Sequence, residues 1–379
     1  MSYIILTIVF FLLAIFCYKK FNSEIMSPSV LTCLIFSLSF LGAFLGTREG
    51  SWNFVKELHF NTLIIILVGV VFFILGEICA RNYKTDKVKE IKLSDSNNKY
   101  IRIDILKKAL VFIFVITTFV LLYLNLRSLV GSGSISKIVK AYKSSNILYN
   151  KKALEEGMVL NPLVLNMVRF CEMFCIVFIY IIVKNLINKD KVKYNISYLI
   201  IIIFIAYVTM LVGGRTVLLK YFMAGFIIWT ILYTRKQKLS LNRFFKISIK
   251  LMIVFVPVCY FVLPLLGGKN SSTFVDYVTF YLGSQIPAFD VFLASPFERS
   301  THFGEMTLKG IQMLLAKFGL INYWSAYQGE WVYFNRELYT NVFSEFKPFM
   351  QDFGIIGVVI CMFIFGFVFS RLYLNAKNK

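Results

Sequence analysis

Residues 298–305 place a histidine, an arginine and two carboxylates within eight positions of the chain. In order they are Glu298-Arg299-Ser300-Thr301-His302-Phe303-Gly304-Glu305. General base catalysis needs a group that titrates near the working pH, or a carboxylate held beside the hydroxyl that it deprotonates. His302, Glu298 and Glu305 meet that requirement by type, so they are candidate catalytic residues. Arg299 is a candidate anion ligand, and a solvated polar loop is the alternative for the whole run.

A second candidate site is the turn Val212-Gly213-Gly214-Arg215-Thr216, which separates two apolar runs. Its two glycines relieve the steric limits of so tight a reversal. Arg215 then precedes a helix N-terminus, where backbone N–H groups and the helix dipole favour an anion. Lys220 follows about 7 Å further along that helix. The two basic side chains are candidates for binding a phosphate-bearing lipid, and an interfacial arginine bound to ordinary lipid phosphate is the alternative.

Two charges lie inside another apolar run, where Arg169 and Glu172 are three residues apart. Charges inside a membrane span are costly and tend to face the protein interior. The spacing is that of a self-neutralising pair on one helix face. The alternative is that Arg169 joins Arg215 in lining an outward-facing cavity, which makes it a third candidate anion ligand.

Aromatic residues gather downstream of the polar run, including Trp324, Trp331 and Tyr339. Such rings stack on sugar faces, and at a membrane surface they also serve as interfacial anchors. These three are candidate sugar-binding residues.

The same segment ends in a polar approach to the last apolar run, with Asn341, then Asp352, then Gly354 and Gly357. Glycines spaced this way permit close helix packing. Asp352 would stand at the N-terminus of the last helix, where capping is its expected role. Catalysis is the alternative role for Asp352.

The candidate residues are positioned by a chain of membrane-spanning character. Apolar runs of about 17 to 22 residues recur, each long enough to cross the hydrocarbon core of a bilayer. The expected helices are 2–18, 28–46, 61–80, 105–127, 162–183, 196–212, 216–233, 247–266 and 353–371. The longest interruption, 267–352, holds eight of the twenty acidic residues and is expected to be an extracytoplasmic loop. We expect one all-α polytopic membrane domain with about nine to eleven transmembrane helices.

Basic residues fix the expected orientation of these helices. They concentrate in 19–27, 81–104, 184–195, 234–250 and the C-terminal tail, which alternate with helix number. Cytoplasmic loops carry an excess of Lys and Arg, so the N-terminus is expected outside and the C-terminus inside. The first apolar run has no basic residues before it and no small-residue cleavage site after it, so we expect a retained helix.

Composition excludes several classes of protein. The chain is 58% hydrophobic and its mean hydropathy is +0.71, far above a soluble domain. The net charge of +21 is spread over short loops and forms no basic face with aromatics, so no nucleic-acid partner is expected. All seven cysteines lie in apolar runs without metal-ligand spacing. Neither a metal nor another cofactor is expected.

Two motifs resemble those of the Wzy-type O-antigen or oligosaccharide repeat-unit polymerases. They are Gly-Gly-Arg-Thr at the tight turn, and Asn-Val-Phe-Ser followed by Asp-Phe-Gly-Ile-Ile-Gly at the last helix. The family's arginine matches Arg215, and its late-loop signature matches Asn341, Asp352, Gly354 and Gly357. Nothing in the family pattern aligns with His302. The resemblance implies a GT-C-like bacterial inner-membrane glycosyltransferase whose members often have ten or more spans.

The resemblance also implies a substrate and a reaction. Donor and acceptor would be polyprenyl-diphosphate-linked oligosaccharides, joined on the outer face into O-antigen, capsule or exopolysaccharide. Arg215, with Arg169, Lys220 or Arg299, would stabilise the leaving diphosphate. The sequence has no Asp-x-Asp motif on a soluble nucleotide-binding fold, so neither a nucleotide-sugar donor nor a required metal is expected. Membrane lipids, a chain-length regulator and a flippase are the further partners. A flippase or transporter of lipid-linked sugar and an O-antigen-type ligase are the alternative functions.

Overall fold

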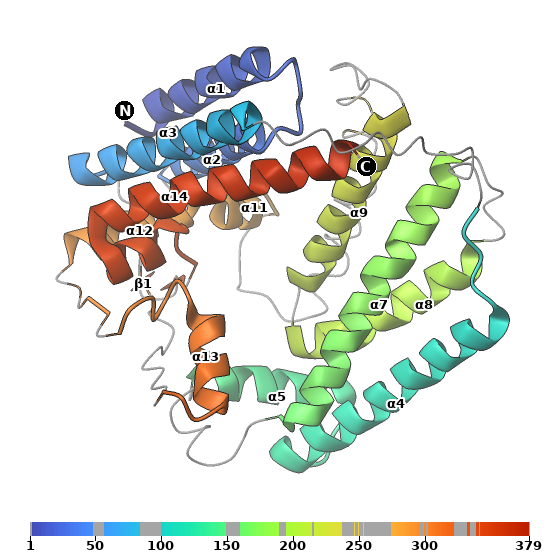
Figure 1. Ribbon diagram of the computed structural model, residues 1–379. Helices are drawn as coiled ribbons and strands as arrows, with labels where there is room; N and C mark the ends of the chain where they lie inside the picture. Colours follow the sequence, from blue (N-terminus) through green and yellow to red (C-terminus); the bar gives the residue numbers. More distant parts are fainter. Residues whose placement is uncertain are drawn as a thin grey trace. The chain divides into compact units, whose positions relative to one another are not determined.

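The computed structural model describes most of the chain, and Figure 1 shows its elements. The described residues are 2–47, 57–83, 100–148, 160–188, 195–213, 216–236, 246, 249, 253, 274–295, 297, 299–300, 302–321, 332–333, 339–340 and 342–378. Apart from one pair of two-residue strands, every described element is a helix. The protein is therefore an all-α polytopic membrane protein, as its hydropathy predicts.

Six described helices are long and apolar enough to cross a membrane. They are α1 (Ser2–Lys20), α2 (Pro28–Gly46), α3 (Phe60–Asn82), α4 (Ile105–Val130), α7 (Pro162–Ile187) and α14 (Phe346–Asn378). Two further helices, α8 (Ile196–Gly213) and α9 (Thr216–Lys236), have shorter apolar stretches. The expected span 247–266 lies almost wholly outside the described residues. How many helices cross the bilayer stays a prediction.

The chain divides into two compact units, although its sequence shows no soluble linker or composition shift between them. One unit consists of Met1–Asp86 with Asn270–Lys379, and the other is Lys87–Lys269. The first unit joins the two ends of the chain because α14 packs along α3. A single domain was the expectation from sequence, since such a long-range pairing leaves no local signal.

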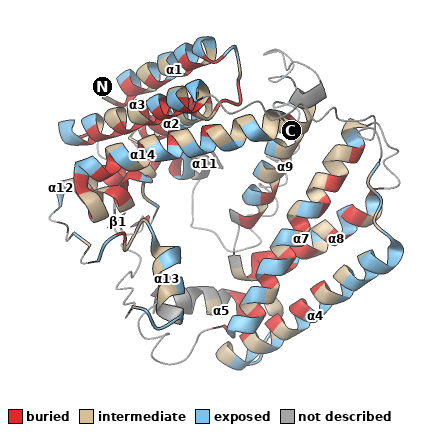
Figure 2. Ribbon diagram, viewed as in Figure 1, coloured by how far each residue is buried: buried red, intermediate tan, exposed pale blue. Residues whose placement is uncertain are grey.

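Stacked aromatic rings connect the helices of the first unit. The Phe10 ring of α1 lies 5.4 Å from that of Phe40 in α2, and Phe36 of α2 lies 5.6 Å from Phe346 of α14. The Phe346 ring in turn lies 6.1 Å from Phe289. Figure 2 shows these helices with their buried faces turned toward each other. Aromatic pairs at these distances stabilise a core beyond the area that they bury.

Two glycines bring α3 and α14 into backbone contact. A Cβ atom added to Gly76 would lie 2.2 Å from the carbonyl oxygen of Phe363, and one added to Gly366 would lie 2.0 Å from that of Phe73. Any larger residue at either position would force the helices apart. Small residues are the usual device for close helix packing in a membrane, where lipid and side chains are equally apolar.

The second unit packs α7 against α8 and α9, with α4 and α5 (Ile135–Leu148) at its side. Its core contains Cys171 and Cys175 of α7, both fully buried. Both thiols are free, and they fill the helix interface as small apolar groups.

The segment 267–352 is more structured than the extracytoplasmic loop that the sequence predicts. It contains α11 (Phe274–Gly283), α12 (Gln285–Ala294), α13 (Lys309–Lys317) and the strands β1 (Val332–Tyr333) and β2 (Tyr339–Thr340). Six residues of α12 are buried in the first unit. With ten residues, α12 is too short for a membrane span, so hydropathy over a span-length window does not predict it.

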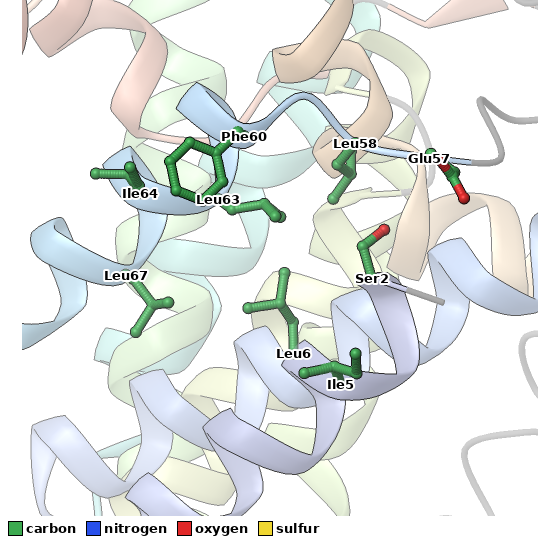
Figure 3. A pocket seen from close by; sticks show the side chains of 9 residues that line it. All are labelled: Ser2, Ile5, Leu6, Glu57, Leu58, Phe60, Leu63, Ile64 and Leu67. Atoms are coloured by element: carbon green, nitrogen blue, oxygen red, sulfur yellow. The ribbon is translucent and has the colours of Figure 1, made fainter.

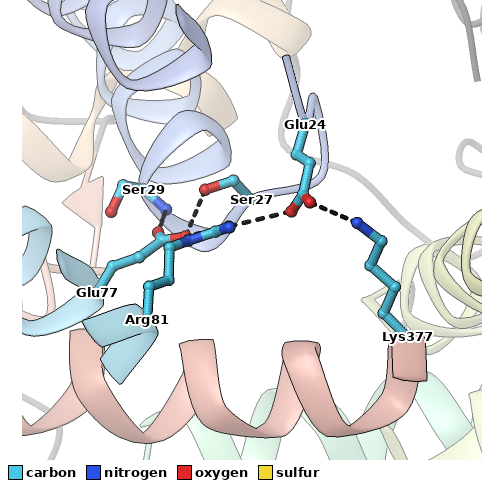
Figure 4. A network of polar contacts seen from close by, with 6 residues as sticks. All are labelled: Glu24, Ser27, Ser29, Glu77, Arg81 and Lys377. Atoms are coloured by element: carbon cyan, nitrogen blue, oxygen red, sulfur yellow. Dashed lines mark hydrogen bonds and ion pairs between the residues drawn. The ribbon is translucent and has the colours of Figure 1, made fainter. Parts of the chain in front are cut away.

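A buried ion-pair network ties together one end of α1, α3 and α14. Glu77, fully buried, accepts hydrogen bonds from the Ser27 hydroxyl at 2.6 Å and the Ser29 N–H at 2.7 Å. Arg81 donates to Glu77 at 2.7 Å and to Glu24 at 3.1 Å. Lys377 at the end of α14 also pairs with Glu24, as Figure 4 shows. The network fixes the α1–α2 turn against the ends of α3 and α14.

Replacing Arg81 with alanine is expected to destabilise the first unit by about 3–5 kcal/mol, because it leaves the buried Glu77 carboxylate without its counter-charge. The change is measured by unfolding in a titration of denaturing detergent. Lys377→Ala is the matched control, with an expected loss of about 1 kcal/mol or less, since its side chain is partly exposed. Equal losses for the two variants would contradict a central role for Glu77.

Candidate functional site

The last helix is interrupted at Gly354, and this break is the centre of the polar site predicted from sequence. Gly354 has φ 69° and ψ −159°, which divides α14 into a short first part and a long second part. Glycine adopts such positive φ values without the steric penalty of other residues. The sequence predicts that Asp352 caps the long apolar helix, but its carboxylate accepts hydrogen bonds from Ser300, Met306 and Thr307 instead. Asp352 lies two residues before the break.

Asp352 holds the candidate loop against this break. Its carboxylate accepts hydrogen bonds from the Ser300 hydroxyl at 2.5 Å, the Met306 N–H at 3.1 Å and the Thr307 N–H at 2.6 Å. The N–H of Ser300 donates to the carbonyl of Gln351 at 3.1 Å. A carboxylate can accept about four hydrogen bonds. These donors occupy most of that capacity, so Asp352 serves as an anchor for residues 300–307.

Three further predicted residues lie in or beside this anchored loop. The Nδ1 atom of exposed His302 lies 3.8 Å from Oε2 of the largely buried Glu305. The ring of Phe303 packs on that of Phe353, with centroids 5.0 Å apart. The guanidinium of Arg299 lies beside Gly354, since a Cβ added there would be 3.6 Å from Nη2. The structure thus gathers Arg299, His302 and Glu305 near the break, while Glu298 lies outside the described residues.

The basic candidates of the second unit have different partners from those that the sequence suggests. The Nζ atom of Lys220 in α9 pairs with Oε2 of Glu172 in α7 at 2.5 Å. Arg169, exposed, donates to the Asn166 side chain at 3.2 Å. Glu172 therefore neutralises a lysine on another helix and not the arginine one turn away. The flexible lysine stem makes this reach possible where α7 packs on α9.

Arg215 falls outside the described residues, between the last residue of α8 and the first residue of α9. Its part in binding a diphosphate, and those of Arg169, Lys220 and Arg299, stay predictions. Tyr339 belongs to β2, where it pairs with Tyr333 of β1. Trp324, Trp331 and Asn341 also lie outside the described residues, so their role in binding sugar stays a prediction.

The sequence reasoning missed one pair, formed by His59 at the start of α3 and Asp290 of α12. The His59 Nδ1 atom lies 2.9 Å from Oδ2 of Asp290, and the His59 N–H donates to Oδ1 at 2.9 Å. The Thr62 hydroxyl also donates to Oδ1, at 2.6 Å. The Asp290 side chain is 1% exposed and that of His59 is 62% exposed. The sequence signal that could have revealed this pair is Asp290 itself, a single carboxylate within the apolar run around Phe289.

A cavity of about 400 Å³ lies between the N-terminal parts of α1 and α3, lined by residues next to His59 in the chain but not by His59 or Asp290 themselves. Figure 3 shows its lining residues, which are Ser2, Ile5, Leu6, Glu57, Leu58, Phe60, Leu63, Ile64 and Leu67. Glu57 and Ser2 lie toward the same side of the view in Figure 3, and the remaining lining side chains are apolar. Leu58 and Phe60 flank His59 in the chain. The cavity therefore has an apolar body and a small polar end.

In the described parts of the chain, no group of three or more His, Cys, Asp or Glu side chains could hold a metal ion. The polar side chains near the break in α14 are carboxylates, a histidine and an arginine, which suit acid–base and anion-binding chemistry.

Comparison with known protein families assigns the chain. The family described as O-antigen polysaccharide polymerase Wzy matches residues 1–264. No curated protein and no solved structure matches the chain. The match includes His59, Arg169, Arg215 and Lys220, and it ends before α12 and the anchored loop. Because it covers more than half of the 379 residues, the chain belongs to the O-antigen polysaccharide polymerase Wzy family.

Proposed function

We propose that this membrane protein, an O-antigen repeat-unit polymerase by its family, uses polyprenyl-diphosphate-linked oligosaccharides as both donor and acceptor. The observation that carries the proposal is the family match over residues 1–264. The product is a surface polysaccharide such as an O-antigen, a capsule or an exopolysaccharide. The break in α14 with its anchored polar loop supports the proposal, because it gives the chain a fixed site for handling sugar hydroxyls.

The reaction needs one leaving group and one proton acceptor. The acceptor hydroxyl attacks the anomeric carbon of the donor, and the bond from that carbon to the diphosphate breaks. The electron pair leaves with the diphosphate, where Arg215, assisted by Arg169, Lys220 or Arg299, stabilises the developing charge. Preorganised donors of this kind typically contribute a few kcal/mol to a transition state. His302, Glu298 and Glu305 are the loop groups with the chemistry to accept the proton, and Asp352 positions them.

The site is placed on the outer face of the cytoplasmic membrane in this proposal. Supporting it, Arg81 and Lys377 share one end of the first unit with Glu24, and His59 and Ser2 lie at the opposite ends of their helices. The end rich in Lys and Arg is the cytoplasmic one by the usual bias. The N-terminus is then outside and the C-terminus inside. Trp324, Trp331, Tyr339 and Asn341 contact the sugars, and a flippase and a chain-length regulator act with the enzyme.

The carbohydrate pattern of a strain that lacks the gene tests this function. A lost polymerase leaves single repeat units on the normal acceptor. Polymer that remains on polyprenyl diphosphate would indicate a ligase, and the absence of any outward-facing material would indicate a flippase. Either of these two patterns contradicts the proposal.

A further inference from the structure

We propose that His59, held by the buried Asp290, is the base that takes the proton from the acceptor hydroxyl. The inference rests on the proposed function and assigns its proton acceptor to His59 in place of the loop groups Glu298, His302 and Glu305, with Asp290 as the positioning residue. It is carried by the contacts of the His59–Asp290 pair and by the apolar cavity lined by residues next to His59 in the chain.

The two oxygens of Asp290 have separate tasks. Oδ1 accepts from the His59 N–H at 2.9 Å and the Thr62 hydroxyl at 2.6 Å, which fixes the first turn of α3. Oδ2 lies 2.9 Å from the Nδ1 atom of the His59 ring. The contacts of Oδ1 are explained by its role at the start of α3. The contact of Oδ2 has no such role, because it is made to the His59 ring, which it orients.

This contact selects the tautomer that a general base requires. A carboxylate only accepts hydrogen bonds, so the proton of a neutral His59 ring lies on Nδ1. The lone pair is then on Nε2, and the ring that carries it is 62% exposed. A buried acid that orients a histidine through Nδ1 is a recurrent arrangement in enzymes that use imidazole as a base.

The contact of His59 with Asp290 differs in kind from that of His302 with Glu305. The Nδ1 atom of His302 lies 3.8 Å from Oε2 of Glu305, three residues away in the same loop. Asp290 by contrast comes from a different helix, 231 positions away, and is within hydrogen-bond distance. The packing of α12 on α3 therefore fixes the orientation of the His59 ring.

The cavity gives the lipid of the acceptor a place next to this base. Leu58 and Phe60, on either side of His59, both line it, and its lining continues along α3 to Leu67. The distance from Phe60 to Leu67 is about 10 Å along a helix axis. The apolar body receives the isoprenoid chain, and the polar end at Ser2 and Glu57 lies toward the head group. The acceptor is thereby held with its sugar near His59.

The proton and electron balance is complete without a further reactant. The acceptor O–H bond breaks as its oxygen bonds to the anomeric carbon of the donor, and the proton moves to Nε2 of His59. The carbon–diphosphate bond breaks, and its electron pair leaves with the polyprenyl diphosphate. Asp290 stabilises the imidazolium through Nδ1–H. His59 then releases its proton to water and is ready for the next unit.

The test uses the full-length protein in liposomes with a purified lipid-linked repeat unit, and it measures kcat and KM. His59→Ala keeps the backbone N–H that donates to Asp290, so it should fold, and its kcat should fall at least about 100-fold. Asp290→Asn keeps an oxygen for the helix cap but presents an N–H to Nδ1, so kcat should fall by more than about tenfold with KM unchanged. Thr62→Val is the matched control, since it removes a cap contact and leaves the ring contact, and its kcat should stay within about twofold.

The outcomes separate the parts of the proposal. A wild-type protein that polymerises and a His59→Ala variant that does so equally well would overturn the base while the polymerase function stands. Equal losses in Asp290→Asn and Thr62→Val would show that Asp290 is a helix cap only. Leu63→Phe, which narrows the cavity, should raise KM several-fold with little change in kcat. An unchanged KM would mean that bulk lipid occupies the cavity, which overturns the assignment of the isoprenoid chain.

Discussion

Cells whose only copy of the protein carries Arg215→Lys are expected to make little polymer, with the rate of chain extension reduced about 100-fold. Lysine keeps the positive charge, but it has one nitrogen where arginine has a planar fork of donors. A diphosphate that leaves during the reaction needs several donors at once, so the fork matters more than the charge. The chain-length distribution of the surface polysaccharide, separated on a gel, measures the effect.

Arg235→Lys is the matched control for this variant, because it makes the same change at the other end of α9. It should leave the polymer at full length. Equal membrane amounts of the two variant proteins, measured by immunoblot, exclude a folding defect. Full-length polymer in cells with Arg215→Lys would remove Arg215 from the diphosphate site and would favour the alternative of an arginine bound to lipid phosphate.

Asp352→Asn is expected to lower polymer formation by at least about tenfold. The asparagine side chain has the same shape, but it replaces one accepting oxygen with an NH2 group that faces other donors. In the native protein the Asp352 carboxylate accepts from the N–H groups of Met306 and Thr307 and from the hydroxyl of Ser300. A buried donor left without an acceptor costs about 1–3 kcal/mol. The loop should therefore separate from the break in α14.

Ser300→Ala provides the control for Asp352→Asn, because it removes one of these contacts and keeps the charge. Its polymer should be reduced much less. Limited proteolysis reports the loop directly, and cleavage within residues 300–307 should rise in Asp352→Asn alone. Normal polymer together with unchanged proteolysis in that variant would contradict the role of Asp352 as an anchor.

The fold class was predictable from sequence because membrane helices are recognised from the hydropathy of local stretches of the chain. The start of α14 was not, since its first part contains Lys347, Gln351 and Asp352. Those residues make the segment resemble a polar loop. In the structure Lys347 is buried, with its ammonium 3.8 Å from the centre of the Phe343 ring. A cation placed over an aromatic face is stabilised there, and a linear sequence does not reveal that contact.

For the candidate site too, local features could be read from the sequence and long-range contacts could not. The cluster of Arg299, His302 and Glu305 was recognisable because its members are close in sequence. The contacts that give the site its geometry are long-range: Asp352 meets Ser300 across 52 positions, and Asp290 meets His59 across 231. No motif spacing encodes either pairing. Only the packing of α12 on α3, and the break at Gly354, brings these residues together.

The most direct measurement of the central claim uses the purified protein in liposomes with one defined polyprenyl-diphosphate-linked repeat unit and no other protein. The account predicts a ladder of products that grow by whole repeat units. It also predicts the release of one polyprenyl diphosphate for every glycosidic bond formed. Repeat units that remain single, whether they stay in place or only change sides of the membrane, would contradict the assignment of this protein as the polymerase.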